Sequence, residues 1–265
     1  MATTYNNLYL DIRQQLRRAG IEEATLEARE LVCFGTNKSR EELARDGGLY
    51  ASPELEHRVR DLVRRHLEGE PVAYLIGEWE FYGLPLDISR DVLIPRPETA
   101  ELVELIVEEN SNARRLLDIG TGSGCIAISL DKKLPDAEVE AWDISEEALA
   151  IARKNNDALE ARVRFLQRDV LADDWEKIPS FDVIVSNPPY VTETEKNEMD
   201  ANVLDWEPGL ALFVPDEDPL RFYNRIARLG SELLLPGGKL YFEINQAYGR
   251  ETAHILEMNQ YRDVR

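Results

Sequence analysis

Hydrophobic residues in the first 75 positions recur at the spacing of an α-helix. Three stripes carry an apolar side chain at every third or fourth position, namely Tyr5, Leu8, Ile12 and Leu16, then Ala24, Ala28, Leu31 and Val32, then Leu55, Val59, Leu62 and Val63. Each stripe gathers on one face of a helix, and that face must be buried against a neighbour. The pattern therefore predicts a small helical-bundle domain over residues 1–75.

The helical part contains a signal for a helix start, and after it the spacing of apolar residues changes. Ser39 stands three residues before Glu42 within the helical part, which fits a capping box at a helix start. Residues 78–89 instead alternate apolar and other side chains around Gly83. This alternation predicts a β-hairpin in a linker at residues 76–94.

From Pro95 onward, short apolar runs alternate with helical stripes. The predicted strands are residues 114–120, 137–144, 162–169, 181–186 and, after a Gly237-Gly238 turn, 239–244. The predicted helices begin near Pro97, Cys125, Ser145 and Asp218. Strands that alternate with helices build a mostly parallel sheet with helices on both faces. We therefore predict an α/β fold for residues 95–265.

The connection between the fourth strand and its helix is long. Residues 191–218 carry acidic and proline-containing stretches. A loop of this length in a compact domain is usually a functional lid or a disordered segment. Because the loop directly follows Asn187-Pro188-Pro189-Tyr190, we interpret it as a cover over a binding site.

Composition limits the class of protein. With 265 residues and 43% hydrophobic content, the chain can bury a sizeable core. No run approaches the roughly 20 apolar residues of a membrane span, and charged side chains stand where a signal peptide needs an apolar stretch. Two separated cysteines, Cys33 and Cys125, and three histidines argue against a zinc or iron–sulfur site. We expect a cytoplasmic protein with reduced thiols, no metal and no membrane partner.

The net charge of −20 limits the partners. Residues 1–80 carry −4 and residues 81–265 carry −16, so the acidity lies mainly in the second part. A protein that grips a phosphate backbone usually carries a basic excess, and we therefore expect no direct binding to nucleic acid. Residues 57–66 are a local exception with four arginines. They fit an amphipathic helix with a solvated basic face or, alternatively, a docking face for an acidic partner.

The first strand of the α/β part leads into a glycine-rich loop, Gly120-Thr121-Gly122-Ser123-Gly124. Glycines let the chain turn tightly and approach a ligand, and the helix that follows offers free N–H groups. A dinucleotide fingerprint would require glycine at position 125, where Cys125 stands. The spacing therefore suits a nucleoside ligand without a pyrophosphate.

Acidic residues end the next two predicted strands. Asp143 stands 19 residues after Gly124, where its carboxylate could accept hydrogen bonds from both hydroxyls of a ribose. Asp169 and Val170 end the third strand, at the neighbouring edge of the sheet, where an adenine would lie. The alternatives are a capping or solvated acid at Asp143, and a loop acid with a packing valine at positions 169 and 170.

The fourth strand runs into Asn187-Pro188-Pro189-Tyr190. Two consecutive prolines remove two backbone N–H donors and fix φ, so neither a sheet ladder nor a helix continues through them. The turn is therefore stiff, with an amide on one side and a phenol on the other. Such a turn could hold a ligand, or it could simply end the strand.

Together these motifs resemble those of the S-adenosylmethionine-dependent methyltransferases that act on planar amide or amino nitrogens. The stretches GEWEFYGLPL, VLIPRPETAELVE, FDVIVSNPPYV, WEPGLALF and KLYFEI are similar, in order and spacing, to those of the glutamine N5-methyltransferases of peptide chain release factors, a HemK/PrmC-like family. The resemblance covers nearly the whole chain. It implies a Rossmann-like methyltransferase domain over residues 95–265, preceded by a helical substrate-recognition domain.

The resemblance implies S-adenosylmethionine as cofactor, with S-adenosylhomocysteine as product and no metal. Gly120–Gly124 would surround the methionine moiety, Asp143 would hold the ribose, and Asp169 or Val170 would lie beside the adenine. Some relatives carry a tryptophan where Val170 stands, so we do not expect stacking there. Asp118 would accept from the cofactor ammonium or would cap the next turn.

The resemblance also assigns the proline turn to the substrate. The Asn187 side-chain oxygen and the Pro188 carbonyl would each accept one N–H of the target amide, Pro189 would stiffen the turn, and Tyr190 would pack against the flat amide. Asn187 would thereby also border the cofactor. An amide nitrogen is a poor nucleophile, so positioning its lone pair would supply most of the catalysis. No side chain need act as a strong base.

The resemblance is incomplete at the C-terminal end. Domains of this class normally close with a sixth strand and a seventh, antiparallel strand beside the fifth, whereas this sequence ends at Arg265. We therefore expect the C-terminal strand to be missing and the edge of the fifth strand to be unpaired. Phe81 would face the cofactor pocket or fill the hairpin.

The resulting hypothesis is methyl transfer to the glutamine of the Gly-Gly-Gln motif in class 1 peptide chain release factors, which would modulate translation termination. The protein would act as a monomer on a protein partner. The alternatives are a ribosomal-protein glutamine methyltransferase and a nucleic-acid methyltransferase for adenine or guanine amino groups, which would have to extract a base. A cofactor-binding protein without catalysis fits the intact motifs poorly.

Overall fold

The computed structural model describes residues 3–172 and 178–265. The chain forms two compact units. The first comprises Met1–Gly77 with Ala201–Trp206, and the second comprises Glu78–Asp200 with Glu207–Arg265. Each unit has its own hydrophobic core. Within the residues described, no helix has the length and apolar character that crossing a bilayer requires.

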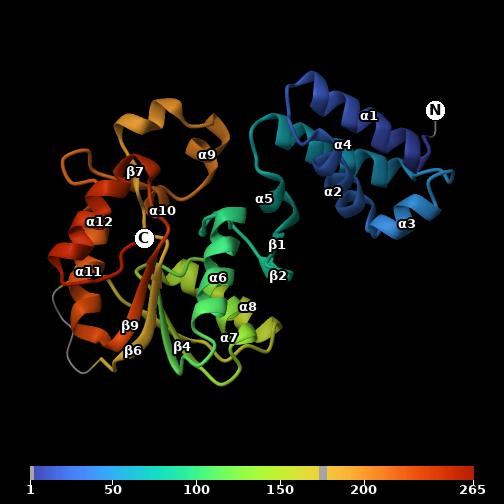
Figure 1. The fold of residues 1–265 in the computed structure, drawn as a ribbon. Helices are drawn as coiled ribbons and strands as arrows, with labels where there is room; N and C mark the ends of the chain where they lie inside the picture. Colours follow the sequence, from blue (N-terminus) through green and yellow to red (C-terminus); the bar gives the residue numbers. More distant parts are fainter. Residues whose placement is uncertain (1–2, 173–177) are drawn as a thin grey trace. The chain divides into compact units, whose positions relative to one another are not determined.

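The first unit contains a bundle of helices, blue to teal in Figure 1. These are α1 (Tyr5–Arg18), α2 (Ala24–Thr36), α3 (Arg40–Arg45), α4 (Pro53–Leu67) and α5 (Val72–Ile76). Each predicted stripe supplies fully buried side chains, among them Leu8, Leu31 and Val59. Helices α2 and α4 approach so closely that a Cβ on Gly35 would lie 2.5 Å from the Val59 side chain. The predicted helical bundle is thereby confirmed.

Local hydrogen bonds fix the helix start predicted at Ser39. Its hydroxyl accepts from the backbone N–H of Glu42 at 3.1 Å, and the Glu42 carboxylate accepts from the Ser39 N–H at 2.9 Å. This reciprocal pair is a capping box, which satisfies two otherwise free donors at the start of α3.

Three of the four arginines of α4 form ion pairs within the first unit, and the fourth, Arg58, donates to Asn37 Oδ1 at 3.2 Å. The pairs are Arg60 with Asp11 and Glu56, Arg64 with Asp61 and Glu68, and Arg65 with Glu70. Exposed ion pairs of this kind contribute little to stability, but they cancel the local positive charge. The contacts favour the amphipathic helix over the docking face.

The second unit begins with the predicted hairpin. Strands β1 (Glu78–Phe81) and β2 (Leu84–Asp87) pair antiparallel. The two residues between them, Tyr82 and Gly83, both have positive φ, at 50° and 76°. Two such residues form the tight turn whose twist matches the flanking strands.

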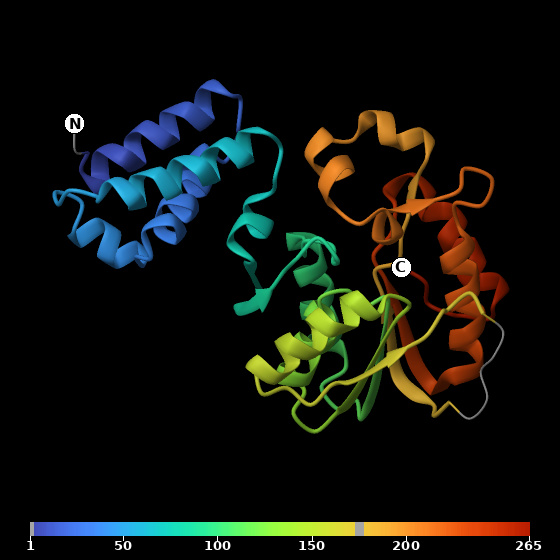
Figure 2. The same ribbon diagram turned by 180° about the vertical axis from the view of Figure 1, so that it is seen from behind.

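A five-stranded parallel sheet is the centre of the second unit, in the order β5-β4-β3-β6-β9. The strands are β3 (Arg115–Ile119), β4 (Glu138–Asp143), β5 (Arg164–Gln167), β6 (Phe181–Ser186) and β9 (Leu234–Phe242). Helices α6 (Pro97–Glu109), α7 (Cys125–Lys133) and α8 (Glu146–Ala158) cover one face, and α11 (Arg221–Leu233) and α12 (Gly249–Met258) cover the other, as Figure 1 and Figure 2 show. The predicted α/β fold with a parallel sheet and helices on both faces is confirmed.

The last strand differs from its prediction. A strand was expected at residues 239–244 after a glycine turn, whereas β9 begins at Leu234 and passes through Gly237 and Gly238. Its pairing with β6 is irregular beside these glycines. A Cβ on Gly238 would lie 3.0 Å from the Asp182 carbonyl oxygen, so the glycine permits a bulge where a turn was expected. In the described part of the chain, β9 is an outer strand of the sheet.

The long connection after β6 is not a plain loop. It contains β7 (Val191–Thr192), a 3-10 helix η1 (Thr194–Glu198), α9 (Ala201–Trp206), α10 (Gly209–Leu212) and β8 (Phe213–Val214). Strands β7 and β8 pair in parallel, which brings the two ends of this connection together. A further 3-10 turn, η2 (Gln246–Tyr248), precedes α12. Each element is too short for its period to be read from the sequence.

Candidate active site

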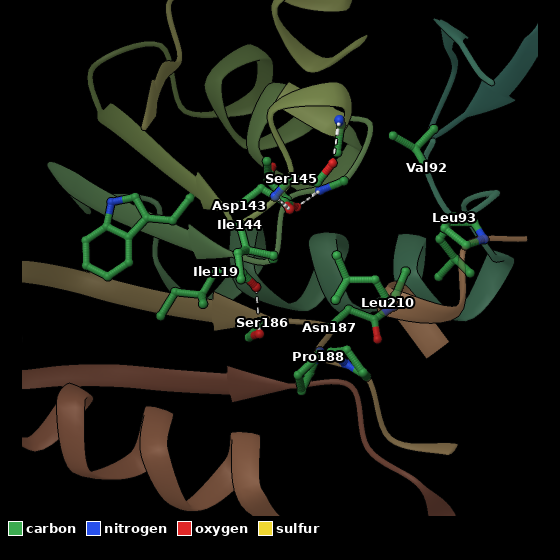
Figure 3. A pocket seen from close by; sticks show the side chains of 18 of the residues that line it. Val92, Leu93, Ile119, Asp143, Ile144, Ser145, Ser186, Asn187, Pro188 and Leu210 are labelled. Carbon is green, nitrogen blue, oxygen red and sulfur yellow. Dashed lines mark hydrogen bonds between the residues drawn. The ribbon is translucent and has the colours of Figure 1, made fainter. Parts of the chain in front are cut away.

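A cavity of about 640 Å³ lies at the carboxyl ends of the parallel strands in the second unit. Loops after β3, β4, β5 and β6 line it, together with residues 90–95 and the α10 region. Figure 3 shows Asp143 and Asn187, from different strand ends, around this hollow, which Val92, Leu93 and Leu210 also line. Ligands bind at this edge of open parallel sheets because the loops diverge there.

Two glycines of the loop after β3 differ in the space around them. Gly122 has a φ of +55°, and a Cβ placed there would meet no atom within 4 Å. Gly124 has a φ of +82°, and a Cβ there would lie 2.9 Å from the Ile128 side chain and 3.3 Å from that of Ala152. Gly122 therefore leaves room at the cavity, whereas Gly124 lets the start of α7 pack on α8.

Asp118, at the penultimate position of β3, is fully buried. One carboxylate oxygen accepts from the Thr121 hydroxyl at 2.6 Å. The other, Oδ1, has no hydrogen-bond partner among the described residues. Burial raises the pKa of Asp118 to about 7, with the Thr121 hydrogen bond opposing this and the Asp143 charge adding to it. The Ala127 N–H also lowers the pKa, and Asp118 itself is outside the cavity lining, so a contact between this carboxyl and a ligand is what the resemblance implies and not a feature of the lining.

Asp143 ends β4 and holds the glycine loop. Its Oδ2 accepts from the Gly122 N–H at 2.8 Å, and its Oδ1 accepts from the Ser145 N–H at 2.9 Å. Burial raises the pKa of this carboxyl, although these backbone donors pull it down. Each oxygen keeps further lone pairs, so the same carboxylate can accept hydroxyl donors from a ligand in the cavity.

The acid and valine after β5 also line the cavity. Asp169 Oδ1 accepts from the Leu171 N–H at 2.8 Å, which is a local turn contact. The Val170 carbonyl accepts from the Arg225 side chain at 2.9 Å, and the Val170 side chain packs against the core. Both residues thus have the local roles of the simpler interpretation while they also line the cavity.

The proline turn follows β6 directly. The Ser186 hydroxyl, one residue before the turn, donates to the Ile119 carbonyl at 2.7 Å and ties the two strand ends together. Asn187 Nδ2 donates to Thr99 Oγ1 at 3.5 Å, and the Tyr190 hydroxyl donates to Glu243 Oε1 at 3.3 Å. Burial, followed by the Glu243 charge, raises the pKa of Tyr190 to about 12, so the phenol stays protonated.

The structure brings nearly all sequence-predicted site residues to one cavity. Those that line it are Gly120, Thr121, Gly122, Ser123, Asp143, Asp169, Val170, Asn187, Pro188 and Pro189. Gly124 and Tyr190 are outside the lining. Phe81 is buried and does not line the cavity either, which favours the hairpin-filling alternative.

Sequence reasoning missed residues that support the cavity from behind. Asn155, buried in α8, donates to the carbonyls of Ser123 and Asp87 at 2.9 and 3.1 Å and accepts from the Asp87 N–H. It thus joins the glycine loop to the hairpin. No local pattern marks such a residue, because its partners are distant in sequence.

A second supporting contact holds the α10 region against the cavity. Glu207 is buried, accepts from the Ile94 N–H at 3.2 Å, and forms an ion pair with Arg96. This fixes the chain beside α10, so that Leu210, Ala211 and Phe213 line the cavity wall. Arg96 and Glu207 lie in two of the quoted family stretches, but nothing in either stretch predicts that they pair. Residues 191–218 were predicted to cover a binding site, and the position of these three residues in the cavity wall agrees with that prediction.

The cavity fits a nucleoside that carries an amino-acid chain. Gly122 leaves open space, Asp143 offers acceptors, and much of the wall is apolar. Among residues 3–172 and 178–265, no three His, Cys, Asp or Glu side chains gather as metal ligands would.

Comparisons with known proteins agree with this geometry. A family model of the methyltransferase small domain matches residues 97–204, and a model of the PrmC N-terminal domain matches residues 7–77. The chain is 69% identical over 207 residues to a release factor glutamine methyltransferase from Bacteroides thetaiotaomicron, covering 78% of this chain and 74% of that protein. It is 49% identical over 201 residues to the protein of the same name from Flavobacterium psychrophilum (74% and 70%), and 40% identical over 245 residues to that from Koribacter versatilis (92% and 87%).

Proposed function

The chain belongs to the family of release factor glutamine methyltransferases, and we propose that it methylates a glutamine side-chain nitrogen (N5) in class 1 peptide chain release factors. The target is the glutamine of the Gly-Gly-Gln motif, and the methyl donor is S-adenosylmethionine. The observation that carries the proposal is the stiff turn at Asn187 and Pro188, whose acceptors border the same cavity as the glycine loop.

The cofactor is held by residues of three strand ends. Gly120–Gly124 surround its amino-acid part, Asp143 accepts from the ribose hydroxyls, and Asp169 and Val170 border the adenine. When bound, the cofactor supplies an electrophilic methyl group on a sulfonium, and S-adenosylhomocysteine remains after transfer. The partly apolar wall of the cavity excludes water from the site, which strengthens each polar contact inside it.

The proline turn orients the substrate amide. Asn187 Oδ1 and the Pro188 carbonyl each accept one N–H of the target group, which directs the nitrogen lone pair toward the cofactor. Within the described chain, no residue donates to Asn187 Oδ1. The amide proton becomes acidic as the nitrogen forms its new bond, and it passes to solvent when the product leaves the site. Positioning of this kind is worth up to roughly 7–11 kcal/mol in favourable intramolecular models.

The test is mass spectrometry of a purified class 1 release factor after incubation with this protein and S-adenosylmethionine. We expect one methyl group on the glutamine of the Gly-Gly-Gln motif. Asn187→Ala should lower the rate by about 100-fold or more, as loss of a positioned polar group commonly does. Asn259→Ala, at the end of α12 and remote from the cavity lining, is the matched control and should leave the rate unchanged.

Two results would contradict the proposal. One is a protein that binds the cofactor but leaves this glutamine unmodified. The other is methylation of a ribosomal protein or of a nucleic-acid base under the same conditions in preference to the release factor, which would support one of the alternative substrates.

A further inference from the structure

Two polar side chains outside the predicted site connect to the proline turn. Thr99 lies in the first turn of α6 and is 2% exposed. Glu243 follows the last residue of β9. Their oxygens meet at 2.6 Å, with the Thr99 hydroxyl donating to Glu243 Oε2. Residues 144 positions apart in sequence are thus joined directly behind Asn187.

The direction of these hydrogen bonds determines which end of the Asn187 amide faces Thr99. A hydroxyl has one hydrogen, and the short contact commits it to the Glu243 carboxylate, which cannot donate when ionised. Toward Asn187, Thr99 Oγ1 can then only accept. The amide must therefore turn its NH₂ to Thr99, as the contact of 3.5 Å records, and its Oδ1 away from it.

The backbone beside Glu243 supports the same turn. The Glu243 N–H donates to the Ser186 carbonyl at 3.1 Å, and the Asn245 side chain donates to the Tyr190 carbonyl at 3.2 Å. The second Glu243 oxygen accepts from the Tyr190 hydroxyl. One carboxylate is therefore hydrogen-bonded to α6 and to the far end of the turn.

We propose that Glu243 and Thr99 form a hydrogen-bond relay that presents the oxygen of Asn187, and not its NH₂, to the substrate amide. This inference rests on the proposed function. Both groups are positioning residues, because they act through Asn187. An Asn187 side chain turned by 180° would place donors against the donors of the glutamine amide, and such a complex could not react. The relay prevents this inversion before the substrate arrives.

The first test compares substitutions at Thr99. Thr99→Val keeps the shape but removes the acceptor, and we expect kcat to fall about three- to tenfold, the range that one neutral hydrogen bond produces. KM and cofactor affinity should stay within about twofold, because the wrongly oriented amide lowers the share of reactive complexes and not the contacts that hold the partner. Thr99→Ser restores the hydroxyl and should restore kcat.

Thr252→Val is the matched control. Thr252 is a buried threonine of α12 whose hydroxyl has no partner among the described residues, and it is outside the cavity lining. Its replacement should leave kcat unchanged. Equal losses in Thr99→Val and Thr252→Val would contradict the relay, as would full activity of Thr99→Val.

The second test reverses the relay. Asn187→Asp places a second carboxylate beside the hydroxyl that Glu243 already occupies, and activity should fall about 100-fold. Adding Glu243→Gln supplies an NH₂ that can donate to Thr99, which frees the hydroxyl to donate to the new carboxylate. We expect the double variant to regain about tenfold over Asn187→Asp alone. The regain must disappear when Thr99→Val is added, and a regain that persists would show charge relief without a relay.

A third measurement separates the relay from the proposed function. In ¹⁵N-labelled protein without substrate, the NH₂ protons of Asn187 should exchange slowly with solvent in the wild type and in Thr99→Ser, and faster in Thr99→Val. Slow exchange in a protein that methylates no release factor would sustain the relay and overturn the proposed substrate. Methyl transfer by a protein in which Thr99→Val changes neither exchange nor kcat would sustain the function and overturn the relay.

Discussion

At the scale of single residues, the buried carboxyl of Asp118 provides a test of the proposed cofactor site. Burial raises its pKa to about 7, so this carboxyl changes its protonation near neutral pH. An ammonium group beside Oδ1 would favour the ionised form. We therefore expect S-adenosylhomocysteine to release a fraction of a proton on binding at pH 7. Calorimetric titration in buffers of different ionisation enthalpy measures this number.

Two controls decide whether the proton comes from Asp118. Asp118→Asn removes the titrating group and should abolish the release. A nucleoside that lacks the amino-acid chain should bind without release, because it brings no ammonium. Release that is unchanged in Asp118→Asn would assign the proton to another group.

Single site residues were predictable where the sequence places them at a strand end. Asp143 and Asn187 follow apolar runs, and parallel strands bring their carboxyl ends to one edge of a sheet. Thr99 and Glu243 were not predictable in this way. Their roles depend on the meeting of α6 with the end of β9. Both residues lie in quoted family stretches, but nothing in either stretch predicts that they are hydrogen-bonded to each other.

At the scale of elements, the glycine loop and helix α7 depend on two glycines for different reasons. Both have positive φ, so alanine at either position costs about 1 kcal/mol or more in backbone strain. At position 124 the added Cβ also overlaps Ile128 and Ala152, which costs a further 1–3 kcal/mol or so. We expect Gly124→Ala to lower the free energy of unfolding in urea more than Gly122→Ala does.

The two variants should also differ in cofactor binding, and Gly122→Ala should lose more affinity than its small loss of stability explains. Gly122→Ala puts a methyl group into open cavity space, so it should weaken cofactor binding in calorimetric titration while the fold stays largely intact. If Gly122→Ala were the more destabilising variant, the assignment of packing to Gly124 would be wrong.

Elements with a long apolar period were predicted well, and the short or irregular ones were not. Helices α1, α2 and α4 and strand β6 follow the predicted positions because burial of one face dictates the pattern. The strand β9 was misplaced because a glycine pair usually signals a turn, whereas here it permits a bulge against β6. Helices α5 and α10 have too few residues to show a period.

At the scale of the whole molecule, the chain has two units, each with its own core. In the first unit, His66 of α4 contacts the Glu27 carboxylate of α2 at 3.0 Å and the Glu70 carbonyl at 2.9 Å. Desolvation lowers the pKa of His66, but these two hydrogen bonds outweigh it and leave the pKa raised. In its protonated form, the imidazole links α4 to the Glu27 carboxylate of α2.

The sign of the pH dependence follows from the raised pKa. Folding favours the protonated imidazole, so this stabilisation is complete below the unfolded pKa of about 6.5 and is lost as pH rises through the folded value. A hydrogen bond between charged groups is worth about 1 kcal/mol or more. We expect calorimetry to find the first unit melting roughly 4–8 °C lower at pH 9 than at pH 6.

Glu27→Gln is the control for this prediction. It removes the carboxylate and keeps the side-chain shape, so the difference between pH 6 and pH 9 should shrink. A first unit that becomes more stable at pH 9, or a pH dependence that survives Glu27→Gln unchanged, would contradict the assignment to this pair.

The strand order has a consequence for how the protein is made. Strand β6 pairs with β3, for example Leu116 with Val183, and the proline turn is held by Glu243 and Asn245. During synthesis, the first 77 residues can therefore fold while the partners of β3 are still missing, since local helical contacts form fastest. The catalytic cavity is completed only after residue 245 has left the ribosome. An arrested nascent chain should thus acquire cofactor binding abruptly, at one late length.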